Sequence, residues 1–176
     1  MSFGVCNTGR SNSWILILVA AILAGLLIFF LLTTAGVTAF ANVFNTTAVA
    51  AVAAGDPVPF TAAGPLENIT FTAPDTLTLG PTAGGTYLVQ WSATPIGVNS
   101  NFAVTVNGVV QPSTAAGILL AVGVPGIVSQ TAEIVIPSGA TVQLVNTGLA
   151  TVLTNLIGGV AVPSAQLNLV RIGPVP

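Results

Sequence analysis

The hydrophobic pattern of the chain changes near residue 45. Residues 14–32 read WILILVAAILAGLLIFFLL, an unbroken apolar run, whereas the apolar residues that follow alternate with polar ones and are interrupted by Gly, Pro and Asn. As a helix, this run would be about 28 Å long, close to the hydrocarbon thickness of a bilayer. Ser11, Asn12 and Ser13 precede it and offer N-cap oxygens. The pattern predicts a polar tail at 1–13, a hydrophobic helix with its connector at 14–45, and a β domain at 46–176.

A helix that is apolar on every side must be buried in lipid or in protein. The apolar segment (residues 14–32) could therefore anchor the chain in a membrane, or pack with other copies in a bundle or a fibre. It could also be a signal peptide, since Arg10 precedes it and Ala39-Phe40-Ala41 resembles a cleavage site, but it exceeds the usual core of about 7–15 residues. The residues expected to contact lipid or partner helices are Trp14, Ile15, Leu18, Ile22, Leu26, Phe29 and Phe30.

The chain after residue 45 has the period-2 alternation that is typical of β-strands. It recurs at 86–92, 102–106, 141–145 and 166–170, and residues 48–54 are expected to form a strand as well. Asn107-Gly108 is a strong hairpin signal, and about eight to ten short strands with Gly/Pro turns between them predict a sandwich or a jelly roll. The inward-facing residues, expected in the core or at a trimer interface, are Tyr87, Val89, Trp91, Phe102, Val104 and Val106.

The amino-acid composition excludes several classes of function. Hydrophobic residues make up 53% of the 176 residues and charged residues only 3%, and the chain has no Lys and no His. It therefore lacks the basic clusters that bind nucleic acid, and it lacks the side chain that most often serves as general base or zinc ligand. We expect a protein that is not an enzyme, uses no cofactor or metal, and binds no nucleic acid. Such a neutral surface needs uncharged polar side chains, or other copies of the chain, to cover it.

The few ionisable residues offer little chemistry. Asp56, Glu67 and Asp75 fall in one segment, but without the spacing of a calcium loop we interpret them as solvated acids. Glu133 and Arg171 lie on two predicted strands and would pair if those strands were adjacent. Cys6 is the one cysteine of the chain. It could form an intermolecular disulfide, carry a modification, or do neither.

Part of the β region resembles a known family. GTYLVQWSATPIGVNSNFAVTVNGVVQPSTAAG (residues 85–117) is similar to the centre of the C-terminal domain of BclA-like spore-surface glycoproteins, with their GTYxxxFSV-type and FAVTLNG-type strands. AEIVIPSGATVQLVN (132–146) is similar to their later strand pair, and 151–172 to their final strands. The resemblance covers about residues 48–172. It implies an all-β, C1q/TNF-like antiparallel jelly-roll sandwich that forms a tight homotrimer on the outer layer of bacterial endospores.

One departure from the family affects the expected function. The best-known members place a collagen-like Gly-x-y stalk before the jelly roll, whereas this chain has the apolar segment there. We therefore expect a structural subunit of an endospore-surface fibre, appendage or exosporium layer, in which that segment links trimers or anchors them, with a spore-surface protein as a further partner. The alternative is a membrane-anchored trimeric ectodomain for surface display or binding. In a bacterial setting the N-glycosylation patterns at Asn45 and Asn68 are read as chance.

Overall fold

The computed structural model describes residues 39–97 and 99–175, and within them the chain is all-β. The expected helix of the apolar segment, and Cys6, lie outside the described residues. In the described part of the chain, no helix is both long enough and apolar enough to span a membrane.

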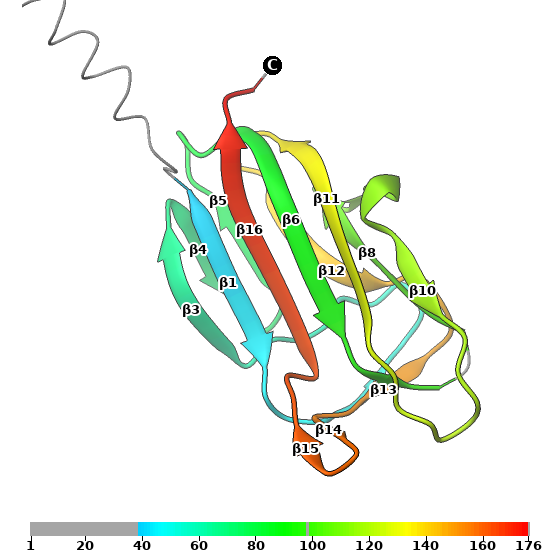
Figure 1. Ribbon diagram of the computed structural model, residues 1–176. Coiled ribbons are helices and arrows are strands. Elements are labelled where there is room, and N and C mark those ends of the chain that lie inside the picture. Colours follow the sequence, from blue (N-terminus) through cyan, green and yellow to red (C-terminus); the bar gives the residue numbers. More distant parts are fainter. Residues whose placement is uncertain (1–38, 98, 176) are drawn as a thin grey trace, which may run out of the picture. The chain divides into compact units, whose positions relative to one another are not determined.

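One main sheet has the strand order β11-β6-β16-β1-β3 and is antiparallel throughout; we name it the β6 sheet (Figure 1). Its strands in that order are Val128–Ile136, Gly85–Ala93, Ala165–Gly173, Phe40–Asn45 and Ala62–Glu67.

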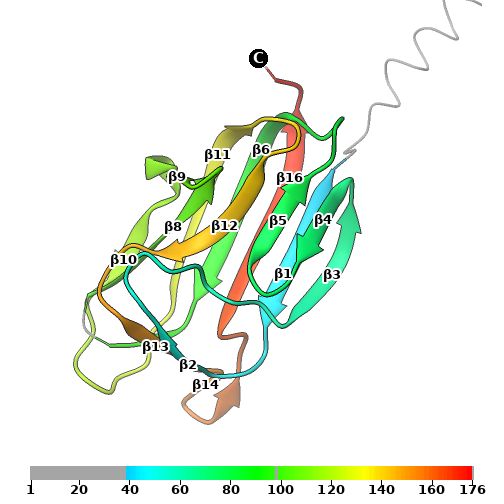
Figure 2. The ribbon, with the colours of Figure 1, turned by 180° about the vertical axis from the view of Figure 1, so that it is seen from behind.

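The second main sheet, the β8 sheet, packs behind the first and has the order β10-β8-β12-β5-β4, with β9 paired to β8 (Figure 2). These strands are Ala116–Ile118 (β10), Ser100–Val106 (β8), Thr141–Asn146 (β12), Thr76–Leu79 (β5), Ile69–Thr72 (β4) and Val109–Val110 (β9). A short 3-10 helix, η1 (Pro112–Thr114), follows β9.

Short strands close one end of the sandwich. They are β2 (Val49–Val52), β13 (Thr151–Leu153), β7 (Pro95–Ile96), β14 (Leu156–Ile157) and β15 (Val160–Ala161). β13 pairs with both β2 and β7, and loop 119–127 joins them through a bridge between Ile96 and Pro125. We call β2, β7, loop 119–127 and segment 149–161 together the end cap.

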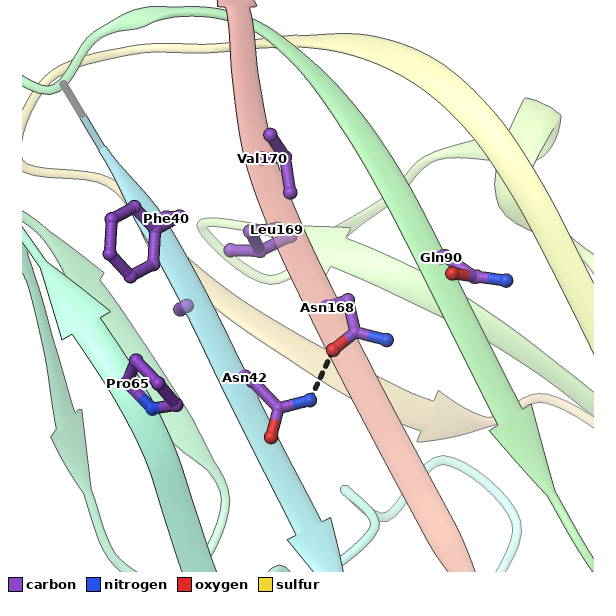
Figure 3. Close-up of a pocket in the computed structure, with 8 residues that line it drawn as sticks. Phe40, Asn42, Pro65, Gln90, Asn168, Leu169 and Val170 are labelled. Carbon is purple, nitrogen blue, oxygen red and sulfur yellow. Dashed lines mark hydrogen bonds between the residues drawn. The ribbon is translucent and has the colours of Figure 1, made fainter. Parts of the chain in front are cut away.

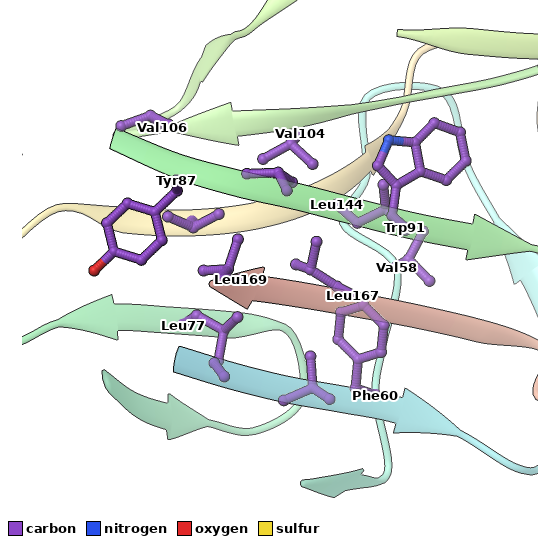
Figure 4. Packing of buried hydrophobic residues seen from close by; sticks show 14 of the residues in the cluster. Val58, Phe60, Leu77, Tyr87, Trp91, Val104, Val106, Leu144, Leu167 and Leu169 are labelled. Carbon is purple, nitrogen blue, oxygen red and sulfur yellow. The ribbon is translucent and has the colours of Figure 1, made fainter. Parts of the chain in front are cut away.

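The core lies between the two main sheets, as Figure 4 shows. Alternation drives its formation, because every second residue of β6, from Gly85 to Ala93, is buried and the others are more exposed. Trp91 and Phe102 meet across the sandwich edge to face, with their ring centroids 6.0 Å apart. No buried side-chain nitrogen or oxygen among the described residues lacks a hydrogen-bond partner. The described domain therefore has a complete core of its own.

The β domain begins earlier than the sequence pattern predicts. β1 starts at Phe40 and pairs along its whole length with β16, although residues 14–45 were expected to be the hydrophobic helix and its connector. Ala41 and Val43 face the core, while Phe40, Asn42 and Phe44 are less buried. The stretch FANVFN contains no charge, so its alternation is hard to separate from the apolar run before it.

The number of strands also exceeds the expected eight to ten, since the described residues form sixteen. The excess comes from the six strands of two or three residues, β7, β9, β10, β13, β14 and β15, which are too short to show clear alternation. The hairpin expected at Asn107-Gly108 is confirmed: it joins β8 to β9, with positive φ angles of 51° and 77° that fit a type I′ turn.

Candidate assembly surface

The six residues that the sequence singled out all lie inside the sandwich: Tyr87, Val89, Trp91, Phe102, Val104 and Val106 are buried. Their polar atoms are satisfied within the domain. The indole Nε1 of Trp91 donates a 2.8 Å hydrogen bond to the carbonyl of Thr114, and the Tyr87 hydroxyl donates to the carbonyl of Ala83. These residues hold the two sheets together, so a surface for partners must be sought on the opposite face of the strands.

The fold perturbs the ionisation of Tyr87. Burial raises the pKa of its phenol above the usual value, and the positive charge of Arg171 offsets part of that rise. Arg171 itself donates to the carbonyls of Gly173 and Thr82, at 3.3 and 3.5 Å. Strand β6 lies between β16, which carries Arg171, and β11, which carries Glu133. Arg171 pairs with Tyr87 of β6 and Glu133 pairs with Leu88, and these two residues of β6 face opposite sides of the sheet. The two strands are therefore not adjacent, and the condition under which Glu133 and Arg171 were expected to pair is not met.

The outward face of the β6 sheet, which we call the assembly face, is built in rows. The pairing of five antiparallel strands places one residue from each strand side by side, with Leu88, Val170 and Phe40 in the middle. Glu133 and Glu67 stand at the two ends of this row, on the edge strands β11 and β3. The row is thus apolar at its centre and acidic only at its margins.

The next row carries side-chain amides. Gln90, Asn168 and Asn42 occupy adjacent positions on β6, β16 and β1, and Thr131 of β11 continues the row. The amide of Asn42 donates to Oδ1 of Asn168, and that same oxygen accepts a 3.4 Å hydrogen bond from Gln166. The centre of the assembly face therefore combines apolar groups with uncharged hydrogen-bonding groups. Low charge of this kind is typical of the buried centre of a protein–protein interface.

A shallow groove of about 440 Å³ lies on this face (Figure 3). Phe40, Pro65 and Val170 contribute apolar groups to its lining, and Asn42, Gln90 and Asn168 contribute amides. None of the lining residues is ionisable or nucleophilic, so the groove offers shape and hydrogen bonds rather than acid–base or covalent chemistry.

Sequence reasoning missed the assembly face because it followed only the inward-facing positions. The signal was present in the outward positions of the same strands: Leu88 and Gln90 in LVQWS, and Asn168 and Val170 in LNLVRIG, carry no charge. Outward residues of a solvated strand are usually polar or charged, so an uncharged outward face on the two central strands β6 and β16 was the available clue.

The remaining polar candidates have structural explanations. Asn45 is buried. Its amide donates to the carbonyl of Pro59 at 3.0 Å, and its Oδ1 accepts from the backbone and the hydroxyl of Thr47, so the first glycosylation pattern builds a turn. Asp75 accepts a 2.7 Å hydrogen bond from Nε2 of Gln143. The described residues contain no group of three or more His, Cys, Asp or Glu side chains placed to hold a metal ion.

Comparison with known proteins gives the fold. No family model matches the sequence, and no curated protein matches it. Among solved structures, the globular domain of zebrafish complement 1qA protein is 14% identical with a TM-score of 0.54, covering 77% of this chain and 98% of that one. Eiger TNF from S. frugiperda is also 14% identical, with a TM-score of 0.56, covering 80% and 96% respectively. The described residues thus form a C1q/TNF-like jelly roll.

Proposed function

We propose that this chain is a non-enzymatic structural subunit that assembles as a homotrimer through the assembly face. The observation that carries the proposal is the uncharged centre of that face, where Leu88, Val170 and Phe40 line up beside the amides of Gln90 and Asn168. Burying such a surface against another copy removes apolar area from water, at roughly 25 cal/mol per Å². It also avoids the several kcal/mol that an unpaired buried charge would cost.

The amides make the contact specific. A buried amide that finds no partner costs about 1–3 kcal/mol, so the copies must meet in an orientation that satisfies Gln90, Asn168 and Asn42. The two acids of the apolar row stand on the edge strands, where they can keep contact with water. These features favour one defined arrangement of copies over loose aggregation, in agreement with the trimer that the family resemblance implies.

The place of this assembly is proposed from the sequence resemblance. GTYLVQWS and FAVTVNG are similar to strands of BclA-like proteins, which favours a subunit of a bacterial endospore appendage, fibre or exosporium layer. The apolar segment would then link trimers into a pilus-like fibre, or anchor them to the spore surface through another protein. We also propose that few ion pairs hold the assembly together, because only 3% of the residues are charged.

The trimer is tested with residues 39–176, which have a complete core. The expected particle has three times the mass of the chain in sedimentation equilibrium. Leu88→Glu places three carboxylates in the proposed interface and should give folded monomers with the far-ultraviolet circular dichroism of the parent. Val109→Glu is the matched control, because this exposed valine lies on β9, outside the β6 sheet. A Leu88→Glu protein that stays trimeric would refute the assembly face.

The alternative function is a membrane-anchored trimeric ectodomain for display or binding. The length of the apolar segment favours it, since 19 residues suffice to span a bilayer as a helix. Detergent extraction separates the two functions. An anchored ectodomain needs detergent to leave the membrane fraction, whereas a fibre subunit sediments as an ordered polymer without detergent and is visible by negative-stain microscopy.

A further inference from the structure

The end cap is an exposed aliphatic surface. In the described part of the chain, eight of the fourteen large hydrophobic side chains that are exposed belong to it. Leu119 and Val122 are 82% and 86% exposed, and Ile127, Leu156 and Val160 are also largely in contact with water. Apolar side chains gathered in this way at one end of a domain usually mark a contact site.

The end cap has a defined shape. Loop 119–127 is tied to β7 by the bridge between Ile96 and Pro125 and by a 3.0 Å hydrogen bond from the amide of Gly126 to the carbonyl of Pro95. In the β14–β15 hairpin, Gly158 and Gly159 take the positive φ angles that the tight turn requires. The aliphatic side chains are therefore presented by a folded support, so a partner does not have to order the whole surface on binding.

The end cap is also free of charge. Its segments contain no Asp, Glu, Lys or Arg, and Asp56 stands only at its border, where its carbonyl accepts from the amide of Asn146. Proteins that bind anionic membrane surfaces use Lys and Arg for attraction to the lipid headgroups. The absence of any basic residue in these segments therefore favours an apolar protein segment over a charged membrane surface.

The chain enters the domain at the opposite end. Ala39 accepts a 3.0 Å hydrogen bond from the amide of Arg171 near the end of β16, whereas Asn45, at the other end of β1, contacts Ser164 beside the end cap. Figure 1 shows β1 running toward the β14–β15 hairpin and away from the C-terminus. The described chain thus begins, at Ala39, at the end of the domain opposite to the end cap. A contact between such ends in successive copies does not close on itself and propagates as a filament.

We propose that the end cap of one copy receives the apolar segment of another copy, so that trimers join head to tail. This inference rests on the proposed self-assembling function and identifies the second surface that it needs. Each chain supplies one apolar segment and one end cap, so the two are matched in number along the whole filament. Both are uncharged and mainly aliphatic, so each removes the other's apolar surface from water without burying a charge.

Cross-linking between different chains tests the contact. Full-length chains are prepared in a Cys6→Ser background, one with Ile15→Cys and the other with Val122→Cys, and are mixed under mild oxidation. The expected product is a disulfide-linked pair of unlike chains, at least tenfold more abundant than with Val109→Cys in place of Val122→Cys. Val109 is also exposed, but it lies outside the end cap. Equal cross-linking at both positions, or cross-linking only when both cysteines are in one chain, would overturn the proposal.

A second measurement separates this inference from the function on which it rests. Full-length Leu119→Asp and Val122→Asp, both changes at highly exposed positions, should leave trimers that no longer polymerise, whereas Val109→Asp should polymerise like the parent. Persistent polymers in the two end-cap variants would refute the inference. The inference would also be refuted if the two end-cap variants still polymerised but no longer floated with phosphatidylcholine vesicles, since the end cap would then bind lipid. If the end-cap variants form trimers that still polymerise, only the end-cap contact is refuted. If the unmodified residues 39–176 are monomeric, the proposed function itself is refuted.

Discussion

The assembly face and the end cap are both poor in charge, but their chemistry differs. The assembly face lies on regular strands and mixes three apolar side chains with a row of amides held in register by the sheet. The end cap is made of loops and two- to four-residue strands and presents aliphatic groups. Amides demand one geometry, whereas aliphatic groups accept many, so the first surface suits a closed ring of fixed symmetry and the second suits an adaptable linker.

A substitution in the hydrophobic core, which supports both surfaces, should have the largest effect on the stability of the domain. Trp91→Ala deletes the indole that packs on Phe102 and leaves the carbonyl of Thr114 without its donor. The expected loss in the free energy of unfolding is about 3–5 kcal/mol, measured by urea denaturation of residues 39–176. Val109→Ala, at an exposed site, should change it by less than about 0.5 kcal/mol. A Trp91→Ala loss as small as that of the control would mean that the core does not depend on this contact.

The sequence predicts the elements behind this core well, because they are long and regular. In β6, β8, β12 and β16, alternating β-branched and aromatic residues between Gly, Pro and Asn turns are enough to place strands and to select the inward residues. β1 was missed because Ala41 and Val43 sit in an uncharged stretch next to the apolar segment. The two-residue strands of the end cap, β7, β14 and β15, were missed because two residues carry no periodicity, whereas β2 lies within the strand that was expected at 48–54.

The candidate site could not be predicted in the same way, because it depends on sheet order. Phe40, Leu88 and Val170 are distant in sequence and become neighbours only when β16 lies between β1 and β6. Alternation states which residues of one strand share a face, but it does not state which strand comes next. The same limit explains why the sequence could not decide whether Glu133 and Arg171 pair. Their strands, β11 and β16, are separated by β6.

A single charge introduced into the amide row should weaken the contact made by the assembly face and leave the end cap unchanged. Asn168→Asp keeps both hydrogen bonds, since Asn168 accepts them through Oδ1, but it adds a carboxylate to each copy at the assembly face. At neutral pH we expect the trimer to dissociate at least tenfold more readily. Below about pH 4, where an ordinary Asp becomes protonated, association should recover. Sedimentation at both pH values checks this.

Asn99→Asp provides the matched control. Asn99 is exposed and also accepts a hydrogen bond through its Oδ1, at 3.1 Å from Nδ2 of Asn101, but it lies beside the end cap, where its carbonyl accepts from Leu149. The same change in charge at this position should leave the trimer intact at both pH values. Equal weakening by both variants would show that net charge, rather than the amide row, decides association.

Alkaline pH should loosen the end of the sandwich that lies away from the end cap. The pKa of Tyr87 is raised by burial in the folded state, so the fold favours the neutral phenol. Its contribution to stability is complete below the unfolded pKa of about 10 and is lost as the pH rises through the folded pKa. The hydrogen-exchange protection factors, which correct for the base-catalysed intrinsic rate, should therefore fall at Tyr87 and its neighbours on β6 and β16 before they fall at the end cap. Tyr87→Phe should remove this pH dependence, and a dependence that persists in it would assign the effect to another group.

Salt should have the smallest effect on the trimer. The assembly face and the end cap should nevertheless respond differently to two salts. Raising sodium chloride from about 0.05 to 1 M shortens the range of interactions between charges to about 3 Å. The centre of the assembly face carries no charge, so the trimer mass should not change. Ammonium sulfate strengthens the burial of apolar surface, and it should lengthen polymers that are joined through the aliphatic end cap while the ring stays trimeric. Light scattering of the full chain, compared with residues 39–176, measures both responses. Dissociation of the trimer in sodium chloride would contradict an interface without ion pairs, because only an attraction between charges is weakened by screening at these concentrations.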